Sequence, residues 1–114
     1  MAINAASHSI NLPDEIAEKH DVQFVVHSRL VIPGAEQLDP HLKDHLRFMK
    51  SQSEKKVLSF SGPFFTRDGK NTGDGMYVLR VDNIEEARRV TEEDPLHKSG
   101  VRVPTITPWL QVMD

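Results

Sequence analysis

The order in which strand-like and helix-like segments alternate is the feature that most constrains the fold of this chain. The first segment, residues 22–31, is rich in β-branched and aromatic side chains and ends at Pro33-Gly34, so it predicts a strand. Its centre, Phe24-Val25-Val26, shows no strict alternation of apolar and polar residues. Such a run is typical of a central strand that is covered on both faces.

The second segment predicts a helix over residues 40–55. Asp39 suits the N-cap, and Pro40 suits the first turn, where its missing N–H costs nothing. Leu42, Leu46 and Met49 recur at helical spacing. These three side chains therefore define the face that the helix should bury.

A hairpin is expected next. Residues 57–61 alternate as in a strand, and Gly62-Pro63 should end it. Residues 67–75 contain three glycines among turn-forming residues, and residues 76–81 predict a third strand. We expect a long connecting loop, which is either an ordinary mobile loop or a lid.

A second helix and a last strand complete the order. Asn83 suits a helix N-cap, and the helix should stop at Asp94-Pro95, because the residue before a proline is disfavoured in the helical region. Residues 101–113 then predict an extended segment. The two prolines in it favour an edge strand or bulges.

The order strand, helix, strand, strand, helix, strand is typical of the ferredoxin-like split β-α-β fold. We therefore predict an α+β domain over residues 22–114, with a four-stranded antiparallel sheet that carries both helices on one face. Residues 1–21 are predicted to be an N-terminal extension with a short helix that begins near Asn11.

The other face of such a sheet would be bare. The chain has more large apolar side chains than one helical layer can cover, namely Phe60, Phe64, Phe65, Met76, Tyr77 and Trp109. We therefore expect a homodimer in which two bare sheet faces pack together.

Composition excludes several classes of function. Fourteen basic and seventeen acidic residues give a net charge of -3, which argues against a nucleic-acid-binding protein. The absence of cysteine excludes a disulfide scaffold, a thiol nucleophile and a cysteine-ligated metal. No apolar run is long enough to span a membrane, and no secretory signal is evident, so a cytoplasmic protein is expected. No nucleotide-binding motif is present, and we expect no cofactor.

A set of short motifs in a fixed order resembles a known family. They are His45, Gly62-Pro63, Gly73-Asp74-Gly75-Met76, Glu86-Ala87, Asp94-Pro95-Leu96-His97, Gly100-Val101 and Pro108-Trp109. Over residues 41–113, about two-thirds of the chain, this pattern resembles the YCII-related, or YciI-like, proteins. The resemblance implies a ferredoxin-like domain that dimerises in the α+β-barrel manner, with an active pair formed by His45 and Asp94.

Two of the motifs point to one branch of that family. Asp-Pro-Leu-His and Pro-Trp are similar to members called muconolactone-isomerase-like, among them a chlorohydroxyhydroquinone dehydrochlorinase. The resemblance thus implies a cofactor-independent lyase or isomerase. Its substrates would be small oxygenated ring compounds of aromatic catabolism, such as hydroxyquinols, halogenated hydroquinones or lactones.

The residues themselves leave two interpretations of the pair. His45 falls within the apolar stripe of its helix, so it is either a partly buried structural histidine or a general acid or base. Asp94 is either the N-cap of a short turn that begins at Pro95 or the carboxylate that orients His45. It also adjoins Glu92 and Glu93, whose repulsion a cationic partner would relieve. We expect a contact between His45 and Asp94 at hydrogen-bond range, ~2.6–3.2 Å, or through one water.

Four further residues are predicted to bind the substrate. His97 would border the pocket, Arg29 or Arg102 would hold an oxyanion, and Trp109 would contact the ligand. His41 lies four residues before His45, and with Asp94 and His97 it could form a metal site, but a solvated His41 and no metal are expected. The alternative to an enzyme is a non-catalytic small-ligand-binding or interaction module. An exposed and widely separated His45 and Asp94 would favour that alternative.

Overall fold

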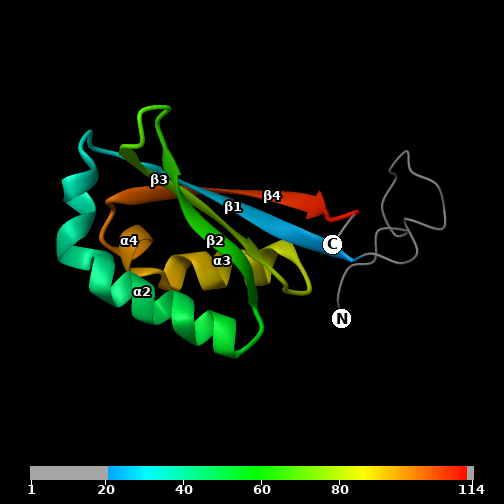
Figure 1. Cartoon of the computed structure of the whole chain (residues 1–114). Helices are drawn as coiled ribbons and strands as arrows, with labels where there is room; N and C mark the ends of the chain where they lie inside the picture. The colour runs from blue at the N-terminus through cyan, green and yellow to red at the C-terminus, as the bar shows by residue number, and fades with distance from the viewer. Residues whose placement is uncertain (1–20, 113–114) are drawn as a thin grey trace.

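A computed structural model describes residues 21–112 and has the predicted order of elements. The elements are β1 (Val22–Leu30), the 3-10 helix η2 (Ala35–Leu38), α2 (Asp39–Glu54), β2 (Leu58–Phe65), β3 (Asn71–Leu79), α3 (Ile84–Glu93), the one-turn α4 (Pro95–Lys98) and β4 (Arg102–Leu110). The four strands form one antiparallel sheet in the order β2-β3-β1-β4, and α2 and α3 lie on the same face of it (Figure 1). The ferredoxin-like α+β fold is confirmed. The predicted helix near Asn11 lies outside the described residues.

Within a single chain, burial alternates along β1, so only one face of this strand is covered and not both as expected. Phe24, Val26 and Ser28 are buried against the helices, whereas Val25 and His27 lie on the opposite face and keep part of their surface exposed. The cause is that both helices pack on one side of the sheet, as the fold requires. The consecutive apolar residues instead give each face of β1 its own apolar surface.

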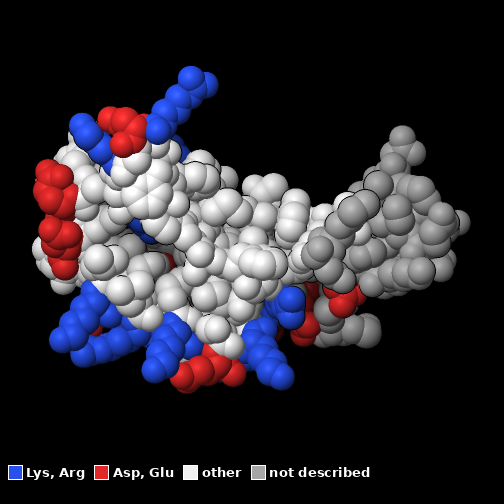
Figure 2. All heavy atoms as spheres, viewed as in Figure 1, with Lys and Arg blue, Asp and Glu red and all other residues white. Residues whose placement is uncertain are grey.

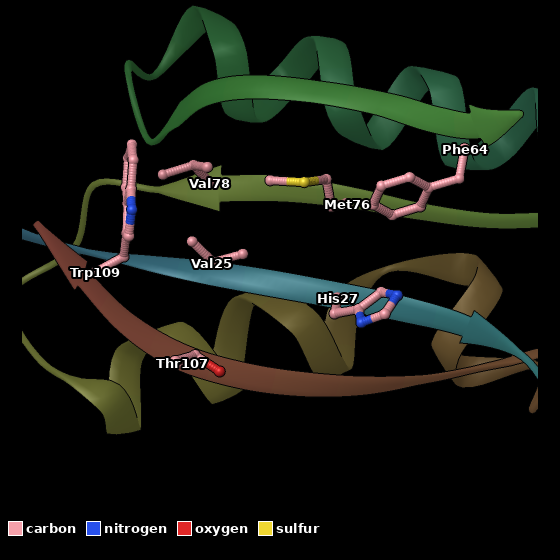
Figure 3. A pocket seen from close by; sticks show the side chains of 7 residues that line it. All are labelled: Val25, His27, Phe64, Met76, Val78, Thr107 and Trp109. Carbon is pink, nitrogen blue, oxygen red and sulfur yellow. The ribbon is translucent and has the colours of Figure 1, made fainter. Parts of the chain in front are cut away.

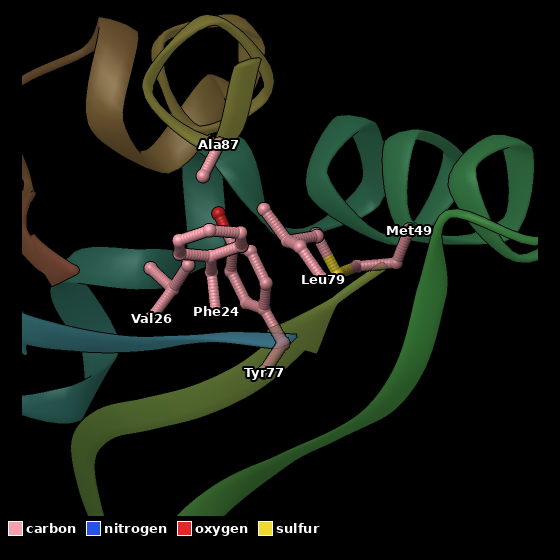
Figure 4. Packing of buried hydrophobic residues seen from close by; sticks show 6 residues of the cluster. All are labelled: Phe24, Val26, Met49, Tyr77, Leu79 and Ala87. Carbon is pink, nitrogen blue, oxygen red and sulfur yellow. The ribbon is translucent and has the colours of Figure 1, made fainter. Parts of the chain in front are cut away.

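The core lies between the sheet and the helices. It consists of Phe24, Val26, Met49, Tyr77, Leu79 and Ala87 (Figure 4). Tyr77 belongs to this core and not to the bare face, which corrects its place among the surplus apolar residues. Alternation along β3 explains this, since Gly75, Tyr77 and Leu79 share the helix-covered face.

The two long helices begin differently. Asn83 caps α3 as predicted, because its side chain accepts a hydrogen bond from the N–H of Glu86. Asp39 does not cap α2: the N-cap is Leu38, and η2 leads directly into the helix. The 3-10 turn supplies the entry geometry, so Asp39 already lies in the first turn beside Pro40.

The hairpin between β2 and β3 is tighter than expected. β2 continues through Gly62-Pro63 to Phe65, and β3 begins at Asn71. The connection is a short turn in which the N–H of Thr66 donates to the carbonyl of Lys70. The expected long loop or lid is therefore wrong. Pro63 fits because β2 is an edge strand with register shifts on both sides of this stretch.

β4 is the other edge strand, as its prolines predicted. Its pairing with β1 runs without interruption from Arg102 to Leu110, so the prolines need no bulge. Among the described residues, no helix is long and apolar enough to cross a membrane.

Candidate active site

His45 and Asp94 form a buried hydrogen-bonded pair. The Nδ1 of His45 lies 2.8 Å from Oδ1 of Asp94, and the two residues are 9% and 0% exposed. His45 comes from the middle of α2, and Asp94 lies at the junction of α3 and α4. The predicted contact is confirmed. Because a carboxylate only accepts, Nδ1 carries the proton, and the structure records no hydrogen bond for Nε2 within residues 21–112.

Asp94 serves as both partner and cap. Its Oδ1 also accepts from the backbone N–H of Leu96 at 2.9 Å, and its Oδ2 accepts from the hydroxyl of Tyr77 at 3.3 Å. Burial by itself would raise the pKa of Asp94. The hydrogen bond and charge of His45, the N–H of Leu96 and nearby His97 outweigh burial and hold that pKa below its ordinary value. Asp94 is therefore a stable carboxylate at neutral pH.

Tyr77 is a site residue that the sequence did not predict. Its side chain points from β3 toward the helices (Figure 4), and its pKa is raised well above its ordinary value by burial and then by the charge of Asp94. The phenol thus stays protonated and donates to Asp94. The period-two alternation with Gly75 and Leu79 was the signal that could have placed it on this face.

His97 lies behind Asp94. Its Nδ1 donates to the carbonyl of Thr91 at 2.7 Å, its Nε2 lies 2.7 Å from the hydroxyl of Ser28, and its ring is 3.9 Å from Asp94 Oδ2. Burial lowers the pKa of His97, although the carbonyl of Thr91 and the charge of Asp94 act in the other direction. The neutral ring therefore accepts from Ser28.

A cavity of about 400 Å³ adjoins the pair. Leu38, Leu42, Leu46 and Met49 line it from η2 and α2, with Pro63 and Met76 from the sheet, whereas His45, Tyr77, Arg102, Ser61 and Asn71 supply its polar groups. The prediction that His97 borders the pocket does not hold for this cavity, because His97 is not among its lining residues. Figure 2 shows mostly uncharged surface over the middle of the sheet, with charged side chains gathered along α2 and at the β2-β3 turn.

Arg102 is built into the wall of this cavity. It is 6% exposed, and its Nε donates to the carbonyl of Gly73 at 2.8 Å. A Cβ at Gly75 would lie 3.1 Å from Nη1 and 3.2 Å from Nη2. Any residue other than glycine at this position would therefore displace the guanidinium. Burial lowers the pKa of Arg102, which is opposed by the charges of Asp94 and Asp74. The structure thus brings Arg102 to the predicted pair.

Arg29 and Trp109 lie elsewhere. Both are exposed residues of the bare face, where Trp109 lines a second cavity of about 500 Å³ (Figure 3). That cavity is also lined by Val25, His27, Phe64, Met76, Val78 and Thr107. Alternation along β1 places Arg29 opposite the buried Ser28. Within one protomer, the grouping of Arg29 and Trp109 with His45 and Asp94 is therefore wrong.

A metal site at His41, His45, Asp94 and His97 is not assembled. Across residues 21–112, no group of three or more histidine or acidic side chains is arranged to hold a metal ion. His41 is half-exposed on α2. The four-residue spacing of His41 and His45 therefore does not bring metal ligands together in the described residues.

Two known proteins are similar to this chain, one in sequence and one in fold. The uncharacterised protein YjpA of Bacillus subtilis (strain 168) is 35% identical over 69 residues, which are 60% of this chain and 75% of YjpA. Among solved structures, the chain is similar to the 5-chloro-2-hydroxyhydroquinone dehydrochlorinase TftG from Burkholderia phenoliruptrix AC1100 in complex with 2,5-dihydroxybenzoquinone. The TM-score is 0.64 over 76% of this chain and 92% of TftG. The two are 17% identical, so this likeness is one of fold.

A family model extends the resemblance toward the N-terminus. The model of the YCII-related domain matches residues 18–110, which include every strand and helix of the described structure. The motifs around His45 and Asp94 fall within that match. This chain belongs to the YCII-related family.

Proposed function

We propose that this protein is a cofactor-independent lyase or isomerase that moves a proton on a small oxygenated ring compound. His45 is the acid and base, and Asp94 orients its ring and stabilises its positive charge. The observation that carries the proposal is the buried 2.8 Å contact between these two residues at the wall of an apolar cavity. An exposed and widely separated pair would instead have favoured the alternative, a non-catalytic binding module.

The contact leaves one ring nitrogen for chemistry. Because Nδ1 donates to Asp94, the neutral ring presents Nε2 as the base, in the tautomer that proton abstraction requires. When Nε2 takes a proton, the imidazolium gains the full attraction of the carboxylate. Asp94 therefore stabilises the charge that develops during the reaction.

The fold neighbour suggests one reaction of this type, the loss of HCl from a chlorinated trihydroxybenzene. His45 would first move a hydroxyl proton to the ring carbon that bears chlorine. Loss of a second hydroxyl proton to Nε2 would then form a C=O bond, while the C–Cl electron pair leaves with chloride. The ring reaches the quinone level without an external oxidant. Return of the proton to a different ring atom would instead give an isomerisation.

We also propose that the protein is a homodimer formed through its bare sheet face. Phe60, Phe64, Val103 and Trp109 are each 40% or more exposed there, beside the cavity of Figure 3. An apolar face of this extent is unusual on a monomer. A second copy would cover it with the same surface by two-fold symmetry.

A turnover screen tests the proposed activity. Chlorinated and unchlorinated hydroxyhydroquinones and ring lactones would be followed by absorbance and chloride release, with the parent and His45→Ala side by side. We expect turnover by the parent and a loss of at least ~100-fold in His45→Ala, in line with the usual contribution of a general base. Turnover that His45→Ala leaves unchanged would contradict the role of His45. Absence of turnover across the panel, with retained binding, would favour the binding module.

A further inference from the structure

We propose that the cavity beside His45 is built for a monoanionic ring compound, whose negatively charged oxygen is bound by the terminal nitrogens of Arg102. This inference rests on the proposed function in taking that cavity as the substrate site. It adds the charge of the ligand and the group that recognises it.

The first argument is the charge of Arg102. Arg102 is 6% exposed as a residue, and a buried guanidinium is costly unless anions or several acceptors compensate its charge. The charges of Asp94 and Asp74 supply part of that compensation. Its single recorded hydrogen bond, within residues 21–112, runs from Nε to the carbonyl of Gly73. None of the ion pairs between described residues includes it. Nη1 and Nη2 therefore have no recorded acceptor among residues 21–112, and Arg102 is one of the residues that line the cavity.

The second argument is that the chain holds this guanidinium in a fixed position. The carbonyl of Gly73 anchors Nε, and the missing side chain of Gly75 makes room for Nη1 and Nη2. Asp74, between the two glycines, binds the N–H of Leu30 at 2.7 Å and so fastens β3 to the end of β1. The Gly73-Asp74-Gly75 motif thus holds the Arg102 side chain in place. A planar fork held in this way suits the two lone pairs of a carboxylate or enolate.

The third argument is the arrangement of the cavity. Its volume of about 400 Å³ suits a single ring, and leucine, methionine and proline side chains make up half of its lining residues. His45 and Arg102 line the same space. A ring with its oxyanion at Arg102 can present a hydroxyl or C–H group to Nε2 of His45. The proton then passes to Nε2, and the electron pair stays on the ligand, where Arg102 stabilises it.

Binding of a matched pair of probes tests the inference without turnover. Benzoate and benzamide have the same ring with and without negative charge, and calorimetric titration at pH 7.5 and fixed ionic strength would measure both. We expect the parent to bind benzoate at least tenfold more tightly than benzamide. Arg102→Gln should weaken benzoate at least tenfold and leave benzamide within twofold. Arg29→Gln, an exposed arginine of the other sheet face, is the control and should change neither.

Two more variants keep the test decisive if Arg102→Gln does not fold. Arg102→Lys keeps the charge but loses the fork, and Gly75→Ala displaces the fork. Each should weaken benzoate at least threefold with benzamide unchanged. Equal binding of the two probes by the parent, or benzoate binding that survives all three changes, would overturn the inference. So would the absence of benzoate binding to the parent at millimolar concentration.

Failure of the proposed function would give a different result. If His45→Ala keeps the preference for benzoate and no ring compound is turned over, the anion site stands and the enzymatic role falls. If turnover depends on His45 but benzoate and benzamide bind alike, the enzymatic role stands and the anion site falls.

Discussion

The two faces of the sheet differ sharply, although the same four strands build both. On the helix-covered face, Tyr77 and Arg102 from the sheet meet His45 from α2 and Asp94 from the end of α3, and their polar groups lie in fixed positions. On the bare face, Phe64 and Trp109 surround an open apolar cavity. The helical layer excludes water and shifts pKa values, whereas the bare sheet offers only apolar area. The comparison teaches that the alternation of strand side chains places the proposed active site and the proposed dimer surface on opposite faces of one sheet.

The largest effect is expected when the charge on the covered face is removed with little change of shape. Asp94→Asn keeps an oxygen for the N–H of Leu96, and asparagine is nearly as good an N-cap as aspartate, so the melting temperature should stay close to that of the parent. The catalytic efficiency, kcat/KM, should fall at least ~10-fold, because the charge that orients and stabilises His45 is lost. Turnover within twofold of the parent at equal melting temperature would leave Asp94 as a cap alone.

A charge on the bare face should instead change assembly. Trp109→Asp places a carboxylate where a second copy would pack, and interfaces of stable homodimers typically bury ~2,000 Å² or more. Light scattering at micromolar concentration should give about twice the 12.9 kDa chain mass for the parent and one chain mass for the variant. Ile32→Asp, at an exposed apolar residue outside the sheet, is the control. A parent that is already monomeric would rule out the dimer.

Loss of one hydroxyl on the covered face should have a smaller effect on activity. Tyr77→Phe removes the hydrogen bond to Oδ2 of Asp94 and keeps the ring in the core. We expect kcat to fall about three- to tenfold and KM to change little, because the 3.3 Å hydrogen bond is long and acts on His45 only through Asp94. We expect Tyr77 to act by positioning Asp94, so the acidic limb of the pH–rate profile should also move. An unchanged profile would give Tyr77 a packing role only.

A smaller effect is expected on stability in mild acid. The pKa of His97 is below its ordinary 6.5 in the folded protein, so the unfolded chain takes up the proton first. The stabilisation is complete above pH ~6.5 and is lost as the pH falls toward the folded-state pKa. Urea unfolding should give a lower free energy of unfolding at pH 5.5 than at pH 7.5 in the parent. The drop should be smaller in His97→Gln and unchanged in the control His41→Gln, and an equal drop in all three would show that His97 is not its source.

Chelation of metal ions should leave activity unchanged, because neither face of the described sheet provides a metal site. The described residues contain no cluster of metal ligands, and the acid–base chemistry proposed for His45 calls for none. Overnight dialysis against EDTA followed by the turnover assay would check this. Loss of activity that zinc or manganese restores would contradict it.

Several local features could be predicted because short-range physics decides them. The cap at Asn83, the helix stop at Asp94-Pro95 and the edge position of β4 follow from backbone hydrogen bonding and from proline geometry. The contact of His45 with Asp94 was also predictable, because the order of elements places both helices on one sheet face. The family resemblance indicated which two residues form the contact, and the predicted topology indicated that they would lie close together.

Other features depended on which neighbours the fold supplies. The Gly62-Pro63 stretch looked like a strand end, yet β2 continues through it, because an edge strand tolerates a proline when β3 pairs along its other side. The Gly73-Asp74-Gly75 motif looked like a loop, yet it is part of β3, and the carbonyl of Gly73 accepts a hydrogen bond from Arg102, which is distant in the sequence. Neither outcome is visible without the pairing partner.

The sequence by itself therefore determined the order of the elements, the helix that carries His45 and the capping role of Asp94, since these depend on residues close together in the chain. Only the tertiary structure decided which arginine joins the pair, that Tyr77 lies in the core, and that Trp109 lies on the far face. The physical reason is that a strand puts successive side chains on opposite faces, so a difference of one residue moves a side chain from one environment to the other. Local pattern fixes that alternation, but only the packing of the helices decides which of the two faces becomes the site.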